Sequence, residues 1–206
     1  MHLVVPFAAA ACDSGATAAQ GLRLPHFERL LARLVPGPAT GTDAASLNLP
    51  HEHVLAACRG WPLRDGGLPL AAWAAQADGL PAVPGGPGWG LLTPTHWQVG
   101  SEQILLLDPA ALHLDEDESC ALLQSLRSLF ETEGWTLHWG APLRWYAAHD
   151  SLAELATASL DRVIGRPIDQ WLPDRRAGRT VRRLQSEVQM LLHTHPINAA
   201  REPRGA

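Results

Sequence analysis

The chain has 206 residues, which is enough for one large domain or two small ones with a buried core. Hydrophobic residues make up 46% of it and charged residues 18%, a composition that excludes an intrinsically disordered protein. The formal net charge of -5 argues against nucleic acid as a partner for the chain as a whole.

The first apolar stretch, HLVVPF, predicts a buried strand. It is a poor export signal, because the first basic residue is Arg23 and Pro6 interrupts a short apolar run. No later stretch approaches the roughly 18 apolar residues that are needed to span a bilayer. Three widely spaced cysteines, Cys12, Cys58 and Cys120, fit a reducing compartment. We therefore expect a cytoplasmic protein that makes no membrane contact.

Three helices are expected in the first half, from apolar residues at helical spacing or from proline at the start and glycine at the end. They cover residues 26-35, 49-60 and 68-79. The segment from Leu80 to Gly90 contains four glycines and three prolines, which predicts a linker. We place a domain boundary near Gly85. It separates an N-terminal α/β portion, residues 1-85, from a C-terminal portion, residues 86-206.

Four strands are expected in the second half, from short apolar runs rich in aromatic and β-branched residues. They cover residues 95-100, 102-109, 135-140 and 143-149. The first two are joined by a turn at Gly100 and Ser101. The acidic run from Leu114 to Ser119 opens a helix that ends at Gly134. We assign these acids to helix capping rather than to a metal site, because the helix dipole favours negative charge at that end.

Two helices are predicted near the C-terminal end. Ser151 and Glu154 match a capping box, so the first covers residues 151-167. The second runs from about Thr180 to His193 and is strongly amphipathic. The order strand–strand–helix–strand–strand predicts an α+β fold, with a mixed or antiparallel sheet, helices packed on it and a long amphipathic helix at the end.

This last predicted helix carries polar residues beside its apolar stripe. Three of them follow one another at four-residue spacing and form a ridge that continues into the segment after the helix. The ridge is either a surface that binds a protein partner or a small-molecule ligand, or the solvated side of an ordinary helix. The predicted binding surface comprises Gln185, Glu187, Gln189, His193, His195, Asn198 and Arg201.

Two His-x-His pairs are typical of metal ligands: His193 with His195, and His51 with His53. On a regular helix, residues two apart point about 200° away from each other, so only an extended segment would aim both at one ion. Zinc would need a further protein ligand, which no neighbouring residue supplies. Capping or core histidines are the alternative, and a divalent metal is the one cofactor that the sequence raises.

Asp13 and Ser14 follow the first predicted strand, where a nucleophile or a phosphate-facing turn is common, although an ordinary turn explains them equally well. They are the only candidate catalytic residues. The chain also has eight tryptophans, many for its length, which indicate either core packing or an aromatic platform for a ligand. Four lie on or beside predicted strands: Trp97, Trp135, Trp139 and Trp145.

Charge is distributed unevenly. Residues 175-206 contain seven arginines and two carboxylates, a net charge of +5, whereas residues 1-174 carry -10. Such a basic segment either contacts phosphates or docks on the acidic remainder of its own chain, and we favour the second interpretation.

The segments PTHWQVG, ASLDRVIGRPIDQWLP and RRLQSEVQMLLHTHPINAAR resemble the regulatory protein RpfE family of proteobacteria, the last segment most specifically. The similarity covers roughly Pro94 to Gly205 and the opening LVVPFA. It implies a regulatory protein. Relatives are often labelled cofactor-independent phosphoglycerate mutases, which would imply two metal ions and a serine nucleophile, and Ser14 is the only candidate for that serine.

Two functions therefore stay open. The first is a non-catalytic regulatory protein that binds a partner or a small ligand. The second is a metal-dependent enzyme resembling a phosphoglycerate mutase, or a phosphohydrolase, that uses Ser14, His193 and His195. We favour the first, because the sequence contains no GxSxG, Walker A or GxGxxG motif.

Overall fold

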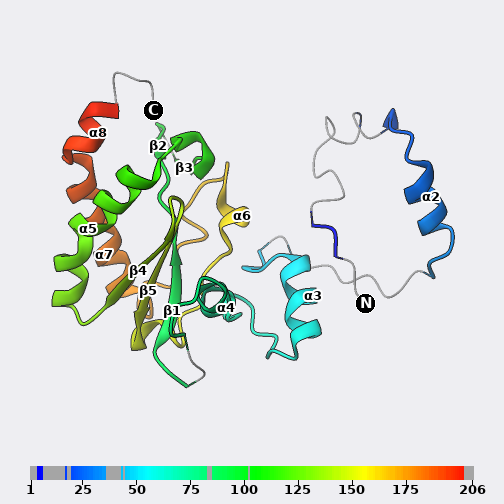
Figure 1. The fold of residues 1–206 in the computed structure, drawn as a ribbon, viewed down its shortest axis with the longest axis horizontal. Helices are drawn as coiled ribbons and strands as arrows, with labels where there is room; N and C mark the ends of the chain where they lie inside the picture. Colours follow the sequence, from blue (N-terminus) through cyan, green and yellow to red (C-terminus); the bar gives the residue numbers. More distant parts are fainter. Residues whose placement is uncertain are drawn as a thin grey trace.

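The computed structural model describes residues 4-6, 17, 20-35, 43, 45-82, 85-101 and 103-201. Figure 1 shows a central sheet with helices on both faces. The helices are α2 (Pro25–Leu31), α3 (Pro50–Arg59), α4 (Leu70–Ala77), η1 (Pro109–Leu112), α5 (Glu116–Thr132), η2 (Asp150–Leu152), α6 (Leu160–Val163), α7 (Arg179–His193) and α8 (Pro196–Arg201). The strands are β1 (Gly88–Leu92), β2 (Trp97–Val99), β3 (Ile104–Leu106), β4 (Thr136–Ala141) and β5 (Arg144–His149).

The predicted α+β fold is confirmed. β1, β5 and β4 form an antiparallel three-stranded sheet with β5 in the centre, and β2 pairs with β3 as a separate antiparallel hairpin. The backbone N–H of Gly100 donates to the carbonyl oxygen of Gln103 at 2.9 Å, which closes the predicted turn of that hairpin. The sheet is antiparallel throughout, one of the two predicted arrangements.

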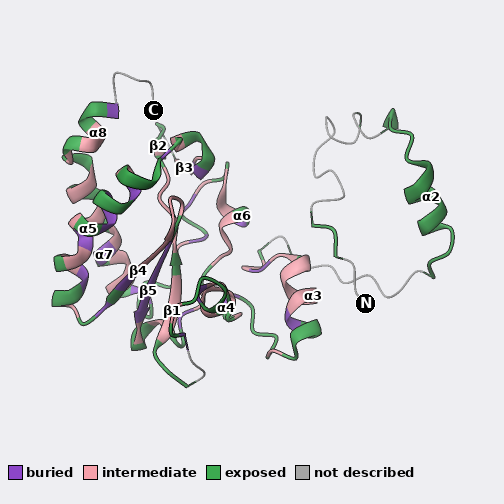
Figure 2. Cartoon of the chain, viewed as in Figure 1, coloured by how far each residue is buried: buried purple, intermediate pink, exposed green. Residues whose placement is uncertain are grey.

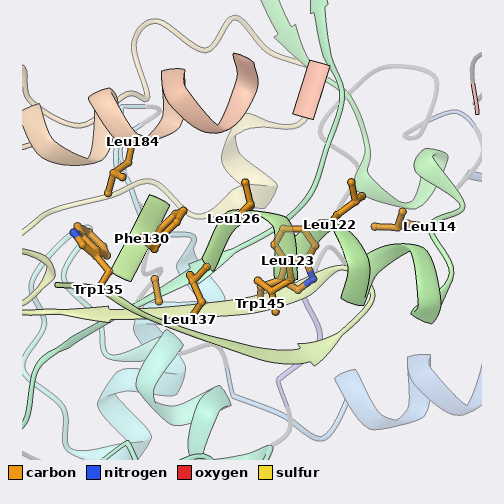
Figure 3. Packing of buried hydrophobic residues seen from close by; sticks show 10 residues of the cluster. Leu114, Leu122, Leu123, Leu126, Phe130, Trp135, Leu137, Trp145 and Leu184 are labelled. Carbon is orange, nitrogen blue, oxygen red and sulfur yellow. The ribbon is translucent and has the colours of Figure 1, made fainter. Parts of the chain in front are cut away.

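One face of the sheet packs against α5, and α7 packs in turn against α5. Leu122, Leu126 and Phe130 recur at four-residue spacing on α5, so they share one side of it, and all three are buried. Figure 3 shows these side chains between Leu184 of α7 and the strand residue Trp145. This layer is the main hydrophobic core, and α5 is held at its start by the predicted acidic cap.

The other face of the sheet packs against α4. Side chains alternate along β5, so Trp145 belongs to the main core whereas its neighbour Tyr146, fully buried, clusters with Ala75 and Ala82. These contacts join residues on both sides of the predicted boundary near Gly85. The division into portions 1-85 and 86-206 stays a prediction.

Three local predictions were wrong. Only α6 is helical between Leu155 and Ile164, although a helix was expected from 151 to 167. Glu154 accepts hydrogen bonds from Arg64 instead of capping. The backbone N–H groups of Thr157 and Ser159 donate to the carbonyl oxygens of Gly66 and Leu47, and these long-range bonds outweigh the local helix signal. The expected linker contains the start of β1, and the described part of the expected first strand, residues 4-6, is not a strand.

The long amphipathic helix at the end is α7, and the short helix α8 follows it. The helix expected over 26-35 is confirmed as the shorter α2, but Figure 2 shows α2 exposed along its whole length. Within the ranges that the structure describes, no helix is long and apolar enough to cross a bilayer.

Candidate functional site

His195 and Asn198, two residues of the predicted surface, lie at the corner between α7 and α8. Asn198 donates from Nδ2 to the carbonyl oxygen of Leu192 at 2.6 Å, which satisfies one of the carbonyl groups left over at the end of α7. His195 accepts through Nδ1 the backbone N–H of Ile197 at 3.3 Å, at the start of α8. Both side chains therefore have structural contacts at this corner.

Arg201 is the most buried of the predicted surface residues, with 4% of its surface exposed. Its guanidinium donates to the carboxylate of Glu118 and to the carbonyl oxygen of Leu112. Asp115 is the N-cap of α5, as predicted for the acidic run, and its Oδ1 accepts the N–H of Glu118 at 2.8 Å. The arginine thus fastens α8 to the first turn of α5.

The ridge on α7 contains the exposed members of the predicted surface. Gln189 and His193 are exposed, whereas Gln185 and Glu187 are half-buried, and Glu187 Oε1 lies 3.7 Å from Arg183 Nη1. In the described part of the chain, the side chains of Gln185, Gln189 and His193 form no hydrogen bond. The ridge stays a predicted surface.

The structure describes the candidate metal-binding histidines but not the two candidate catalytic residues. Asp13 and Ser14 lie outside the described residues. His53 Nε2 lies 3.7 Å from Asp65 Oδ1. Among the residues that are described, no group of three or more His, Cys, Asp or Glu side chains is arranged to hold a metal ion.

The basic C-terminal segment contacts the acidic body. Arg183 Nη2 lies 2.5 Å from Glu133 Oε2, and this hydrogen bond raises the pKa of Arg183. Arg201 pairs with Glu118 in the same way. These contacts agree with the self-docked interpretation of the segment.

The tryptophans near the strands belong mainly to the core. Trp135 and Trp145 are buried, and Trp139 packs against the same cluster. Ser119, fully buried on α5, accepts the indole N–H of Trp139 at 3.1 Å and of Trp145 at 2.9 Å, and donates to the carbonyl oxygen of Pro142 at 2.9 Å. The core interpretation is confirmed for Trp135 and Trp145.

A charged cluster links α4 to the turn between β4 and β5. Arg144 donates to both carboxylate oxygens of Asp78, at 2.8 and 3.0 Å, and Tyr146 donates to Oδ2 at 2.7 Å. The hydrogen bond from Arg144, followed by that from Tyr146, lowers the pKa of Asp78. A Cβ at Gly140 would lie 2.6 Å from Asp78 Oδ2, so glycine leaves room for the cluster.

Tyr146 should make stability fall at alkaline pH. Burial, followed by the hydrogen bond to Asp78, raises its pKa from 10.0 to about 12. Between these values the unfolded chain has lost the proton that the folded chain keeps, so the free energy of unfolding should fall by about 2 kcal/mol as pH rises. Tyr146 is the only tyrosine, so tyrosinate absorbance titrates it alone. A midpoint near 10 in the folded protein, or an equally steep loss of stability in Tyr146→Phe, would contradict this.

A shallow, open groove lies next to the charged cluster. It has a volume of about 400 Å³ and is formed by the end of β1, the turn between β4 and β5, η1 and α6. Its lining is mostly apolar and includes Leu91, Leu143, Leu160 and Ile164. The charged lining residues are Asp108, Asp161 and Arg144. Because Arg144 is already paired with Asp78, the uncompensated charge of the groove is negative.

Local contacts fix the walls of this groove. Asp108 is the N-cap of η1, and its Oδ1 accepts the N–H of Ala110 at 2.9 Å. The N–H of Gly165 donates to the carbonyl oxygen of Leu106 at 2.8 Å, and Ile164 bridges to the same β3 residue, which places α6 beside the hairpin. Sequence reasoning missed the groove, because four separate segments contribute to it and none contains a recognisable motif.

A buried polar network attaches the segment before α3 to α6. Asn48, 3% exposed, accepts the N–H of Gly66 at 2.6 Å and donates to Ser159 Oγ at 3.1 Å. Arg162 donates from Nη2 to the carbonyl oxygens of Asn48, at 3.2 Å, and Asp43, at 3.4 Å. These hydrogen bonds join the segment before α3 to Gly66 and α6, so the network fits a structural clasp better than a binding site.

A scan against protein-family models, a search of curated proteins and a search of solved structures each returned no match for this chain.

Proposed function

We propose that the chain is a regulatory, partner-binding protein whose groove binds a basic, apolar segment of another protein. The observation that carries this proposal is the groove, with an apolar lining and two carboxylates, Asp108 and Asp161, that no lining cation neutralises. The resemblance to the RpfE family supports a regulatory role. One of the segments that carry it, residues 158-173, includes the groove residues Leu160, Asp161 and Ile164.

The groove suits such a partner for two physical reasons. Burial of apolar side chains on Leu91, Leu160 and Ile164 would supply most of the binding free energy. Exposed carboxylates would accelerate association with a basic segment and disfavour an acidic one. By contrast, the α7 ridge consists of polar side chains and lacks the apolar lining of the groove, which is why we place the binding site in the groove.

Selection of peptides tests this proposal. Random 14-residue peptides displayed on phage are selected on the full chain, and we expect enrichment of sequences that combine apolar residues with Arg or Lys. The variant Ile164→Glu should weaken the selected peptides at least about tenfold, since a charge in an apolar contact costs more than 1.4 kcal/mol. The matched control is Met190→Glu, at a position on α7 that is 74% exposed and does not line the groove.

The same experiment separates the groove from the ridge. A double variant, Gln189→Ala with His193→Ala, should keep the binding of the selected peptides. If this variant loses them while Ile164→Glu retains them, the ridge is the binding surface and the groove is not. If no basic, apolar peptide is enriched, the proposed function is wrong.

A further inference from the structure

α2 is a short helix whose apolar side no other described residue covers. Phe27, Leu30, Leu31 and Leu34, on or just after this helix, are 44%, 42%, 50% and 57% exposed. Helices of fewer than about 12 residues are marginal in water without packing, and α2 has seven residues. The helix therefore needs a surface that covers its apolar side.

The groove has the chemistry to be that surface. Arg29 and Arg33 are spaced by four residues, so they lie next to each other on this segment, beside its apolar side rather than within it, and Glu28 is its only acid. The positive charges of the two arginines are complementary to the uncompensated carboxylates of Asp108 and Asp161 in the groove. The apolar side chains of the helix match the apolar lining. Charge and hydrophobicity are thus complementary between two parts of one chain.

The chain that follows α2 returns to α6, the helix that forms one wall of the groove. Arg162 donates to the carbonyl oxygen of Asp43 at 3.4 Å, and it lies on α6 between the groove residues Asp161 and Ile164. The intervening residues 36-42 span at most about 25 Å, at 3.3–3.6 Å per residue. Such a short tether gives an effective concentration in the millimolar range, so even a weak intrachain contact would be populated.

We propose that α2 docks in the groove of its own chain and there competes with the partner segment. This inference rests on the proposed function and adds its regulation: the partner must displace an internal segment of the same chemistry. If α2 fills the groove about nine-tenths of the time, the apparent dissociation constant of the partner rises about tenfold.

Disulfide trapping in the full chain tests the docking. The three native cysteines, Cys12, Cys58 and Cys120, are replaced by serine, and Leu31→Cys is combined with Ile164→Cys. We expect an intrachain disulfide in the monomer, formed at least about ten times faster than in the control pair Leu31→Cys with Gln189→Cys, because only docking raises the local concentration. Equal rates overturn the proposal. A disulfide that forms only between chains overturns it too, since α2 would then dock on a second copy.

Peptide binding tests the competition. The variant Leu30→Asp with Leu31→Asp changes exposed positions, so the fold should be retained, and it should bind the selected peptides about tenfold more tightly than the unchanged chain. The matched control is Val99→Asp, an exposed position on the separate hairpin. If the peptides bind the double variant and the unchanged chain equally, and no intrachain disulfide forms, then α2 is not an internal competitor, but the proposed function still stands. Failure of every peptide on both chains contradicts the proposed function instead, while the disulfide still reports whether α2 docks.

Discussion

Replacement of Arg201 by alanine is expected to lower the free energy of unfolding by about 3–5 kcal/mol, the usual cost of removing one partner of a buried ion pair. The Arg201 side chain is 5% exposed and that of Glu118 is 16% exposed, so the carboxylate would be left with little access to water. The carbonyl oxygen of Leu112 would lose its donor as well. Chemical denaturation followed by circular dichroism measures the loss.

Two variants act as controls for this prediction. Arg166→Ala removes an exposed guanidinium and should change stability by less than about 0.5 kcal/mol. Arg201→Met combined with Glu118→Gln removes both charges and should recover part of the loss, because no unpaired carboxylate then stays buried. If Arg201→Ala unfolds at the same denaturant concentration as the unchanged chain, the ion pair does not stabilise the corner between α7 and α8.

Replacement of Ser119 by alanine should cost about 2–3 kcal/mol, although it removes a single oxygen atom. That oxygen accepts the indole N–H groups of Trp139 and Trp145 and donates to Pro142, so its loss leaves two donors and one acceptor without a partner in the core. Unfolding monitored by tryptophan fluorescence measures the effect. Ser128→Ala, at an exposed position on the same helix, should be nearly neutral. Equal stability of the two variants would contradict this prediction.

Elements whose signals are local were predictable from the sequence. The helix α5 has a capping aspartate, Asp115, and a strict four-residue apolar repeat, while Gly134 ends it with a positive φ of 78°. The same holds for α7 and for the β2–β3 hairpin. Where long-range contacts decide the structure, prediction failed. The segment from 155 to 159 has helical periodicity, but its backbone groups bond to residues 47 and 66 instead.

The candidate site was predicted less well than the fold. Helical spacing correctly placed Gln185, Gln189 and His193 on one helix. It could not show that Arg201 is buried in an ion pair with Glu118, which is 83 positions away in the sequence. Nor could it identify the groove, whose charge depends on the pairing of Arg144 with Asp78 across 66 positions. Spacing along a chain carries information about one helix or strand, whereas burial and net local charge depend on which elements meet.

The clasp of Asn48, Ser159 and Arg162 bears on how the protein opens. α3 contributes only one buried residue, Ala56, so its hydrophobic attachment is small. Its Glu52 accepts hydrogen bonds from Asn48 and Ser159, which attach it to the clasp. Amide protons of α3 should therefore exchange with solvent faster than those of α5, through a partial unfolding that leaves the sheet intact. Because Arg162 also donates to the carbonyl oxygen of Asp43, this partial unfolding would release the segment that connects α2 to the rest of the chain. Local unfolding of α3 and the clasp would then determine how often α2 leaves the groove.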